Sequence, residues 1–149
     1  MPAAIARTTR LLGFAGLLPQ LAAAALVASG RGELHFFGRV LALVYGIVIL
    51  SFLGGVWWGF AVRRTDDQGT LAAVAIIPSL AGVALMIAVQ FGLPLPRALV
   101  LLGTTIALTL FVDRRLVATG EAPDGWMGLR VPLSLGLGGL TIIAGVLAR

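Results

Sequence analysis

The sequence predicts an all-α, polytopic integral membrane protein, a bundle of five transmembrane helices in a single domain over residues 1–149. Hydrophobic residues make up 59% of the chain and charged residues only 11%, whereas a soluble domain carries about 25% charged residues. The apolar residues form runs close to the roughly 20 residues that a helix needs to cross a bilayer. Short turn-forming segments separate the runs, so we expect no soluble domain.

Five apolar segments are long enough, or nearly long enough, to span a membrane. The predicted spans are about residues 11–28, 36–62, 71–91, 98–117 and 129–148. The second is the longest and is expected to tilt or to project from the bilayer. The connecting segments read GRGE, RRTDDQG, GLPLPR and TGEAPDGWMG, and their glycines, prolines and aspartates are typical of turns.

The arginines predict an orientation. With five spans, the N-terminus and the second and fourth loops share one side of the membrane. That side holds seven arginines, namely Arg7, Arg10, Arg63, Arg64, Arg114, Arg115 and Arg130. The other side holds four, namely Arg31, Arg39, Arg97 and Arg149. By the positive-inside rule, the N-terminus is expected in the cytoplasm and the C-terminus outside.

The N-terminal segment has a second interpretation. Arg7 and Arg10, an apolar run and then ALVASG resemble a signal peptide, whose cleavage would leave four spans. The run is long for a signal peptide, and the residues before a cut at Ala28 match the small-x-small pattern poorly. Retention of the segment, and hence five spans, is therefore the favoured interpretation.

Composition excludes several kinds of site. The arginines stand singly or in pairs between apolar runs, as at membrane flanks, whereas a nucleic-acid interface gathers them on one face; we expect no nucleic-acid partner. The chain has no cysteine, which rules out disulfides, thiolate metal sites and iron–sulfur clusters. The single histidine, His35, would supply only one axial haem ligand per chain. With Arg39 it is expected to meet anionic lipid headgroups, and we expect no metal and no cofactor.

Small residues recur in the stretch SFLGGVWWGFAVRR of the second span. Ser51, Gly55 and Gly59 lie four residues apart and share one face of a helix, and Gly54 widens the same groove. Small residues at this spacing let another helix approach closely in lipid. This helix-packing seam is either an interface for a partner or a contact within the bundle. The second interpretation is favoured because five helices must pack together.

The same stretch contains a tryptophan pair. Trp57 lies nearly opposite Gly55 on a helix, so we expect it to face lipid or the membrane interface, where tryptophan is common. Trp58 lies nearer the small-residue face and is the better candidate to touch another helix or a ligand. A packing or interfacial role is favoured over ligand stacking.

A polar stripe runs along the fourth span, where Thr105, Thr109 and Asp113 recur every four residues. An ionisable residue in or near a span is a functional hypothesis by default, here a proton relay or ion site. The alternative is structural: Asp113 pairs with Arg114, Arg115 or Arg130 and anchors the fifth helix. The structural interpretation is favoured because no other acid lies inside a span.

Further polar and proline residues fall within the spans. Gln20, Tyr45 and Gln90 are each able to hydrogen-bond between helices. Pro19 and Pro78 are expected to kink their helices and to free carbonyl groups that neighbours must satisfy.

Several short motifs together resemble a known family. In order they are GLLP, YG, SFLGG, WG, PS, DRR, a lone tryptophan and LR, at residues 16–19, 45–46, 51–55, 58–59, 78–79, 113–115, 126 and 129–130. This order is similar to that of bacterial members of the transmembrane protein 69 family, known as domain of unknown function 3429. The resemblance implies a multi-span protein of bacterial inner membranes, with mitochondrial relatives in eukaryotes, and implies no reaction.

Two functional hypotheses remain. The sequence contains no nucleophile elbow, phosphate-binding glycine loop or paired intramembrane acids, so an enzyme is not expected. The favoured hypothesis is a non-enzymatic accessory or assembly protein that packs in the lipid bilayer against another membrane protein or against itself. The alternative is binding or transport of a small hydrophobic or anionic molecule between the helices, with Tyr45, Trp58, Thr105, Thr109, Asp113 and Arg130 as the candidate polar network.

Overall fold

The computed structural model describes residues 5–148, which fold into helices without a strand. In chain order these are α1 (Arg7–Ala15), α2 (Leu18–Ala28), α3 (Gly32–Ala61), α4 (Gln68–Gln90), α5 (Leu95–Ala118) and α6 (Trp126–Leu147). Because α1 and α2 form one apolar stretch, the described residues contain five helical segments of 22 to 30 residues that are long and apolar enough to cross a membrane. The predicted all-α fold is confirmed, and so is the prediction of five helical segments apolar enough to span a membrane.

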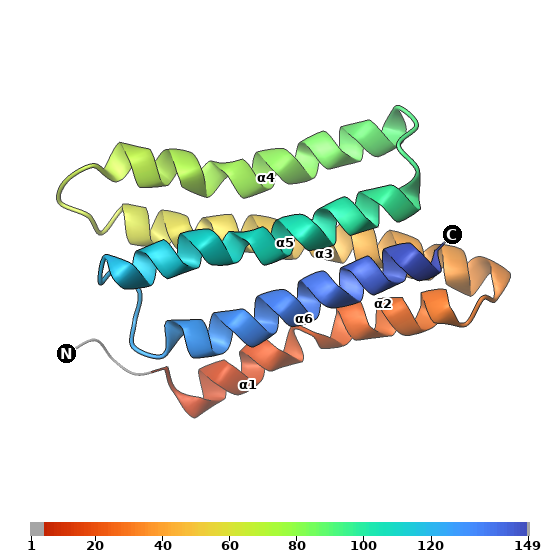
Figure 1. Cartoon of the computed structure of the whole chain (residues 1–149), viewed down its shortest axis with the longest axis horizontal. Coiled ribbons are helices and arrows are strands. Elements are labelled where there is room, and N and C mark those ends of the chain that lie inside the picture. The colour runs from red at the N-terminus through yellow and green to blue at the C-terminus, as the bar shows by residue number, and fades with distance from the viewer. Residues whose placement is uncertain (1–4, 149) are drawn as a thin grey trace.

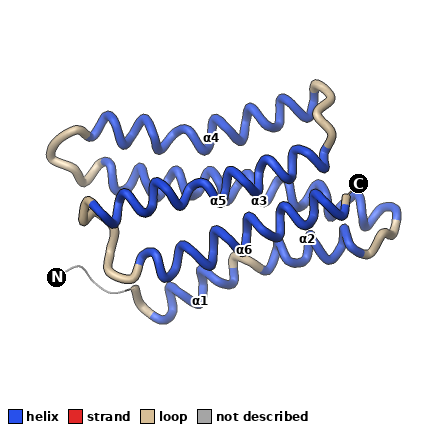
Figure 2. Tube along the Cα trace, viewed as in Figure 1, coloured by secondary structure: helices blue, strands red, loops and turns tan. Residues whose placement is uncertain are grey.

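The first span is interrupted, as the loop between α1 and α2 shows in Figure 2. Pro19 has no backbone N–H and occupies the first turn of α2, so the helical hydrogen bond to the carbonyl of Ala15 is lost. The hydroxyl of Tyr45 on α3 donates a hydrogen bond of 2.6 Å to the carbonyl of Gly16 at the break. The predicted distortion at Pro19 thus takes the form of a short interruption between two helices of one span. Pro78, by contrast, lies inside a helix that continues from residue 68 to residue 90.

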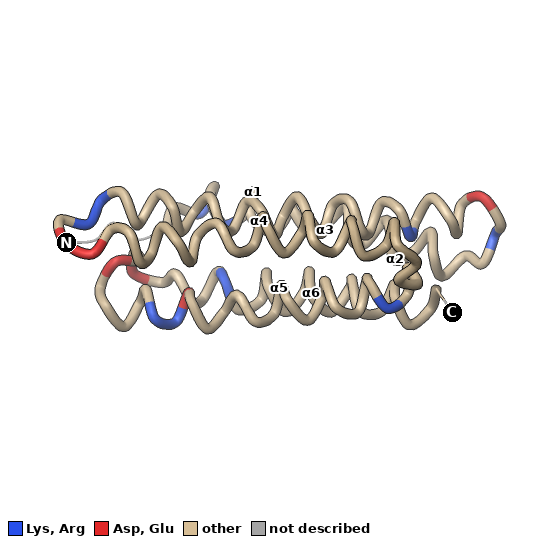
Figure 3. The backbone as a smooth tube through the Cα atoms, turned by 90° about the horizontal axis from the view of Figure 1, so that it is seen from above, with Lys and Arg blue, Asp and Glu red and all other residues tan. Residues whose placement is uncertain are grey.

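The five spans run along the long axis of the molecule in alternating directions, with α1 and α2 in line as the first of them (Figure 1). The start of α1 and the α3–α4 and α5–α6 loops lie at one end, and the end of α6 lies at the other. Charged residues gather towards the two ends and leave the middle almost free of charge (Figure 3). Arg149, one of the arginines predicted on the C-terminal side, lies outside the described residues.

Glycines bring the helix backbones close together. A Cβ atom on Gly103 of α5 would lie 2.5 Å from the carbonyl oxygen of Gly138 on α6, and one on Gly138 would lie 2.7 Å from that of Gly103. A Cβ atom on Gly54 of α3 would overlap the carbonyl oxygen of Ala75 on α4. Such contacts exclude any side chain and are how helices associate in lipid.

The surface of the bundle suits a lipid environment. Large apolar side chains point outwards along its length, among them Phe52, Phe91 and Phe111, which are 64%, 86% and 68% exposed. A soluble monomer rarely exposes so large a continuous apolar surface. At one end of the bundle, Arg64 donates hydrogen bonds from Nε and Nη2 to the carboxylate of Glu121, at 2.8 and 2.5 Å, and ties the α3–α4 loop to the α5–α6 loop. The chain is therefore a multi-pass membrane protein.

Candidate functional site

A completely buried carboxylate lies between three helices. Asp113 of α5 is 0% exposed. Its Oδ1 accepts hydrogen bonds from the indole Nε1 atoms of Trp57 on α3 and Trp126 on α6, both at 3.1 Å. Its Oδ2 accepts a hydrogen bond of 2.8 Å from Nε of Arg130 on α6. One carboxylate thus holds α3, α5 and α6 together.

Helical spacing brings these groups to one place. Trp126 and Arg130 are four residues apart, so they project from the same face of α6. The same spacing places Thr109 one turn from Asp113 on α5. Nη2 of Arg130 lies 3.5 Å from the Thr109 hydroxyl, which itself donates a hydrogen bond of 2.6 Å to the carbonyl of Ile106. Arg130 is 5% exposed, and its charge is compensated by Asp113. Breaking such a buried pair is costly.

The cluster of Trp57, Asp113, Trp126 and Arg130, here called the polar cluster, lines one end of a cavity of about 400 Å³. The remaining lining residues come from α1, α3 and α6 and are mostly apolar: Thr9, Leu12, Gly13, Gly16, Ile49, Phe52, Leu53, Val56, Leu129, Leu133 and Leu137. Leu12 and Phe52 are 69% and 64% exposed, so the cavity reaches the lipid-facing surface between α1 and α3. An apolar cavity of this size with a few converging polar groups is typical of a small-molecule site.

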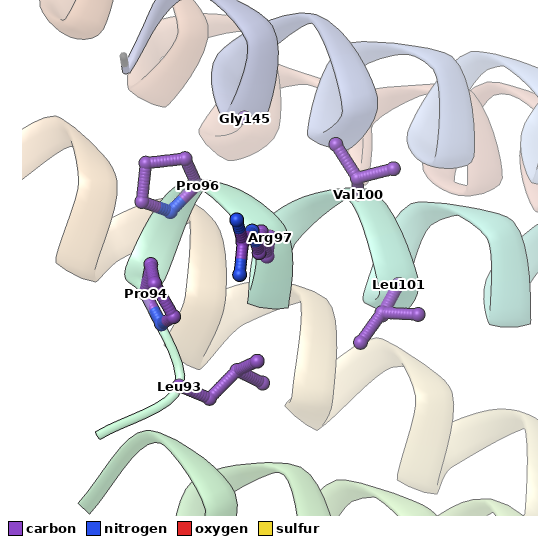
Figure 4. Close-up of a pocket in the computed structure, with 7 residues that line it drawn as sticks. All are labelled: Leu93, Pro94, Pro96, Arg97, Val100, Leu101 and Gly145. Atoms are coloured by element: carbon purple, nitrogen blue, oxygen red, sulfur yellow. The ribbon is translucent and has the colours of Figure 1, made fainter.

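A second hollow lies where α4 turns into α5 (Figure 4). It has a volume of about 710 Å³ and is lined by Leu93, Pro94, Pro96, Arg97, Val100, Leu101 and Gly145. Its one charged side chain, Arg97, is exposed, and no buried polar group faces it, so it is a surface groove rather than a built site. Within residues 5–148, no three His, Asp or Glu residues come together in a way that would hold a metal ion.

The predicted polar network is brought together only in part. Thr109, Asp113 and Arg130 meet, and the expected pairing of Asp113 with an arginine is confirmed, with Arg130 as the partner. Thr105 does not join them, because its hydroxyl donates to the carbonyl of Leu101 on its own helix, at 2.9 Å. Tyr45 holds the break between α1 and α2 and does not reach the polar cluster.

The roles expected for the tryptophan pair are reversed. Trp57, expected to face lipid, is 3% exposed and bonded to Asp113, whereas Trp58 is 48% exposed. The buried face of α3 includes Leu50 and Ala61, which are seven residues before and four residues after Trp57 and therefore lie on its side of the helix. Trp126, placed in a loop by the sequence, begins α6 and was missed as a site residue.

The small-residue seam is also only partly an internal contact. Gly54 packs against α4, and Ser51 is half-buried. Gly55 and Gly59 are exposed, and a Cβ atom at either position would meet nothing within 4 Å. Packing within the bundle, the favoured interpretation, is therefore wrong for Gly55 and Gly59, because the buried side of α3 faces away from them.

A second polar contact lies deep in the bundle. Gln20 of α2 is 0% exposed, and its Nε2 donates to the Thr141 hydroxyl of α6 at 2.6 Å and to the carbonyl of Ala42 at 3.3 Å. The predicted interhelical hydrogen bond of Gln20 is confirmed. His35 bridges neighbouring helices, with its Nδ1 2.8 Å from the carbonyl of Val27.

Comparison with known protein families gives a match over nearly the whole chain. The family described as Protein of unknown function (DUF3429) matches residues 5–147, in agreement with the resemblance carried by the short motifs. No curated protein and no solved structure matches the chain. The chain therefore belongs to the DUF3429 family of proteins of unknown function.

Proposed function

We propose that this protein is a non-enzymatic binding protein of the bacterial inner membrane, and that it holds a small amphipathic molecule in the cavity between α1, α3 and α6. The observation that carries the proposal is the buried Asp113–Arg130 pair at one end of an otherwise apolar cavity. Ionisable groups within a span are expensive and are characteristic of functional sites. The proposal favours the second of the two sequence-based hypotheses.

The polar cluster is expected to determine affinity and selectivity. A molecule dissolved in the bilayer gains little by moving its apolar body from lipid into an apolar cavity, because lipid tails are as apolar as leucine side chains. Its polar end gains more, because hydrogen-bond donors are scarce in the hydrocarbon region. Arg130 offers such donors next to the apolar wall of Leu129 and Leu133.

The proposed placement has the N-terminus in the cytoplasm and the C-terminus outside, on the positive-inside rule. Arg63 and Arg64 lie in the loop that shares an end with the start of α1, and Arg114 and Arg115 lie near the end of α5 (Figure 3). The bilayer itself is the constant partner, and no nucleic acid is proposed.

Two neighbouring leucines provide a matched test of the cavity. Leu11 and Leu12 are both exposed on α1, at 62% and 69%, but only Leu12 lines the cavity. The tagged protein would be purified from its own membrane in mild detergent and measured by native mass spectrometry. We expect a defined small-molecule mass on the wild type and on Leu11→Trp, and its loss from Leu12→Trp, whose indole fills the opening. A bare wild-type chain, or equal occupancy in both variants, would contradict the proposal.

A second candidate function is docking of a partner helix on the seam, either from another membrane protein or from a second copy. Gly55 and Gly59 favour it, because they leave the backbone of α3 bare towards lipid. Gly55→Leu and Gly59→Leu are then expected to abolish a defined association while the protein still inserts. Gly139→Leu on α6 is the control, since a Cβ atom there also meets nothing within 4 Å. Retention of every partner by both seam variants would rule out this function.

A further inference from the structure

We infer that the molecule held in the cavity is neutral, that its polar end is a hydrogen-bond acceptor such as a ketone or ester oxygen, and that Nη1 of Arg130 donates to it. This inference rests on the proposed function and specifies its ligand chemistry. It follows from which donors and acceptors of the polar cluster are already used.

The acceptor of the cluster is enclosed by donors. Asp113 is 0% exposed, and Trp57, Trp126 and Arg130 surround its carboxylate with three N–H donors. A cationic or hydrogen-bond-donating ligand would need this carboxylate as its partner. The carboxylate has about four acceptor positions, so one is unused, but no surface of Asp113 is exposed. Such a ligand would therefore have to displace a tryptophan or the arginine, which would then lose its own bond in a low-dielectric site.

The donors of the cluster are not all occupied. A guanidinium carries five N–H bonds, and Nε of Arg130 uses one on Asp113. Nη2 makes only a long contact of 3.5 Å with the Thr109 hydroxyl. Nη1 makes no hydrogen bond to any residue between 5 and 148. It is also not completely buried, because the buried polar atoms without a partner do not include it. Because Arg130 lines the cavity, Nη1 is the unused donor of the polar cluster that a ligand is able to reach.

The net charge of the site favours a neutral hydrogen-bond acceptor over an anionic ligand. Asp113 and Arg130 together carry no net charge, and Arg130 is the one cation among the residues that line this cavity. An anionic ligand would therefore leave an uncompensated negative charge in an apolar site within the membrane, which is strongly unfavourable. A carbonyl oxygen accepts the same hydrogen bond from Nη1 without adding charge.

The size and opening of the cavity fit a molecule with a longer apolar part. A volume of about 400 Å³ lies at the lower end of the range for small-molecule sites, about 300–1,000 Å³. It accommodates a polar end and a short apolar stretch. A longer chain would leave between Leu12 and Phe52 into the surrounding lipid.

Four probes with the same 11-carbon skeleton test the inference: undecane, 2-undecanone, undecanoate and undecylammonium. The protein would carry Trp58→Phe, so that exposed Trp58 adds no background and the emission of Trp57 and Trp126 reports the cavity. Titrations in phosphatidylcholine nanodiscs at pH 8 are expected to give saturable binding of 2-undecanone at least tenfold tighter than that of the other three. Arg130→Lys keeps a cation beside Asp113 but removes Nη1, so it should weaken 2-undecanone binding at least tenfold, whereas Arg97→Lys should not.

Each outcome decides a separate question. Tightest binding of undecanoate or undecylammonium would overturn the neutral-acceptor inference and leave the binding function standing. Equal binding of undecane and 2-undecanone would overturn the role of Arg130. Saturable binding of none of the four would count against the proposed function itself. The ranking on the unmodified site remains decisive even if Arg130→Lys fails to fold.

Discussion

The buried pair of Asp113 and Arg130 allows a quantitative prediction. In Asp113→Asn the amide oxygen still accepts from the two tryptophans, but the amide nitrogen is a donor facing Nε of Arg130, so the 2.8 Å charge-assisted bond is lost. That bond contributes about 1.5–3 kcal/mol, and the arginine is left buried without a counter-charge. Removing one partner of a buried pair costs about 3–5 kcal/mol in total, which is the expected loss in the free energy of unfolding.

The double variant is the decisive measurement. With Arg130→Gln added to Asp113→Asn, the two neutral amides are able to hydrogen-bond to each other, and no charge remains. Replacing a whole buried pair is often close to neutral, so the double variant should be more stable than either single variant. Unfolding free energies would come from reversible SDS titration in mixed micelles.

The control is Thr105→Val on the same helix, whose hydroxyl bonds only to its own backbone and whose loss should change stability by less than about 0.5 kcal/mol. A cost below about 1 kcal/mol for Asp113→Asn would refute this account of the pair. So would a double variant whose loss equals the sum of the single losses, because the two groups would then not be coupled.

Three further predictions concern packing, the helix break and the loops. Gly138→Ala places a methyl 2.7 Å from a carbonyl oxygen of α5 and should lower the free energy of unfolding by about 1–3 kcal/mol. Gly139→Ala, where a Cβ atom meets nothing within 4 Å, should not lower it. Equal effects of the two variants would contradict the close contact. Tyr45→Phe removes the 2.6 Å hydrogen bond at the α1–α2 break. The free energy of unfolding should fall by about 0.5–1.5 kcal/mol, and amide hydrogen exchange at residues 15–20 should become faster. Unchanged exchange would show that the hydroxyl does not stabilise the break. The hydrogen bond from Arg64 lowers the pKa of Glu121, so the loop tie is complete above the ordinary glutamate pKa of about 4.3 and is lost as the pH falls through the lowered value. The NMR signal of the Arg64 Nε–H should move over that acidic range in the wild type and not in Glu121→Gln.

The sequence was sufficient to predict the spans but not all of their ends. Composition and turn residues predict five apolar helices because the bilayer sets both their length and their polarity. All five spans begin three or four residues earlier than the apolar runs suggested, for example α3 at Gly32 rather than residue 36, and α6 at Trp126 rather than residue 129. The kink at Pro19 was predicted, but its partner was not: the carbonyl of Gly16 is satisfied by Tyr45, a residue of another helix. The sequence of the first span alone does not identify such a partner.

The site was predictable along each helix but not between helices. Thr109 and Asp113 share a face because they are four residues apart, a spacing fixed by the helix itself. The rotation of α3 about its axis is fixed instead by the helices that pack against it. The sequence of α3 shows which residues share a face but not which face points into the bundle. The assignment of outward and inward sides to Gly55 and Trp57 was therefore reversed. The buried residues Leu50, Trp57 and Ala61 are no more apolar than the lipid-facing ones, so hydrophobic patterning did not distinguish the two faces.

Asp113 has a structural role and a positioning role at the same time. A lone arginine at this depth would be strongly unfavourable, so its presence beside the cavity requires a counter-charge. The carboxylate supplies that charge through Nε and fixes the plane of the guanidinium, which leaves Nη1 free for a ligand. The tryptophans hold the carboxylate in turn from two other helices. A change at Asp113 should therefore impair ligand binding as much as a change at Arg130, although the Asp113 side chain, at 0% exposed, acts through the arginine.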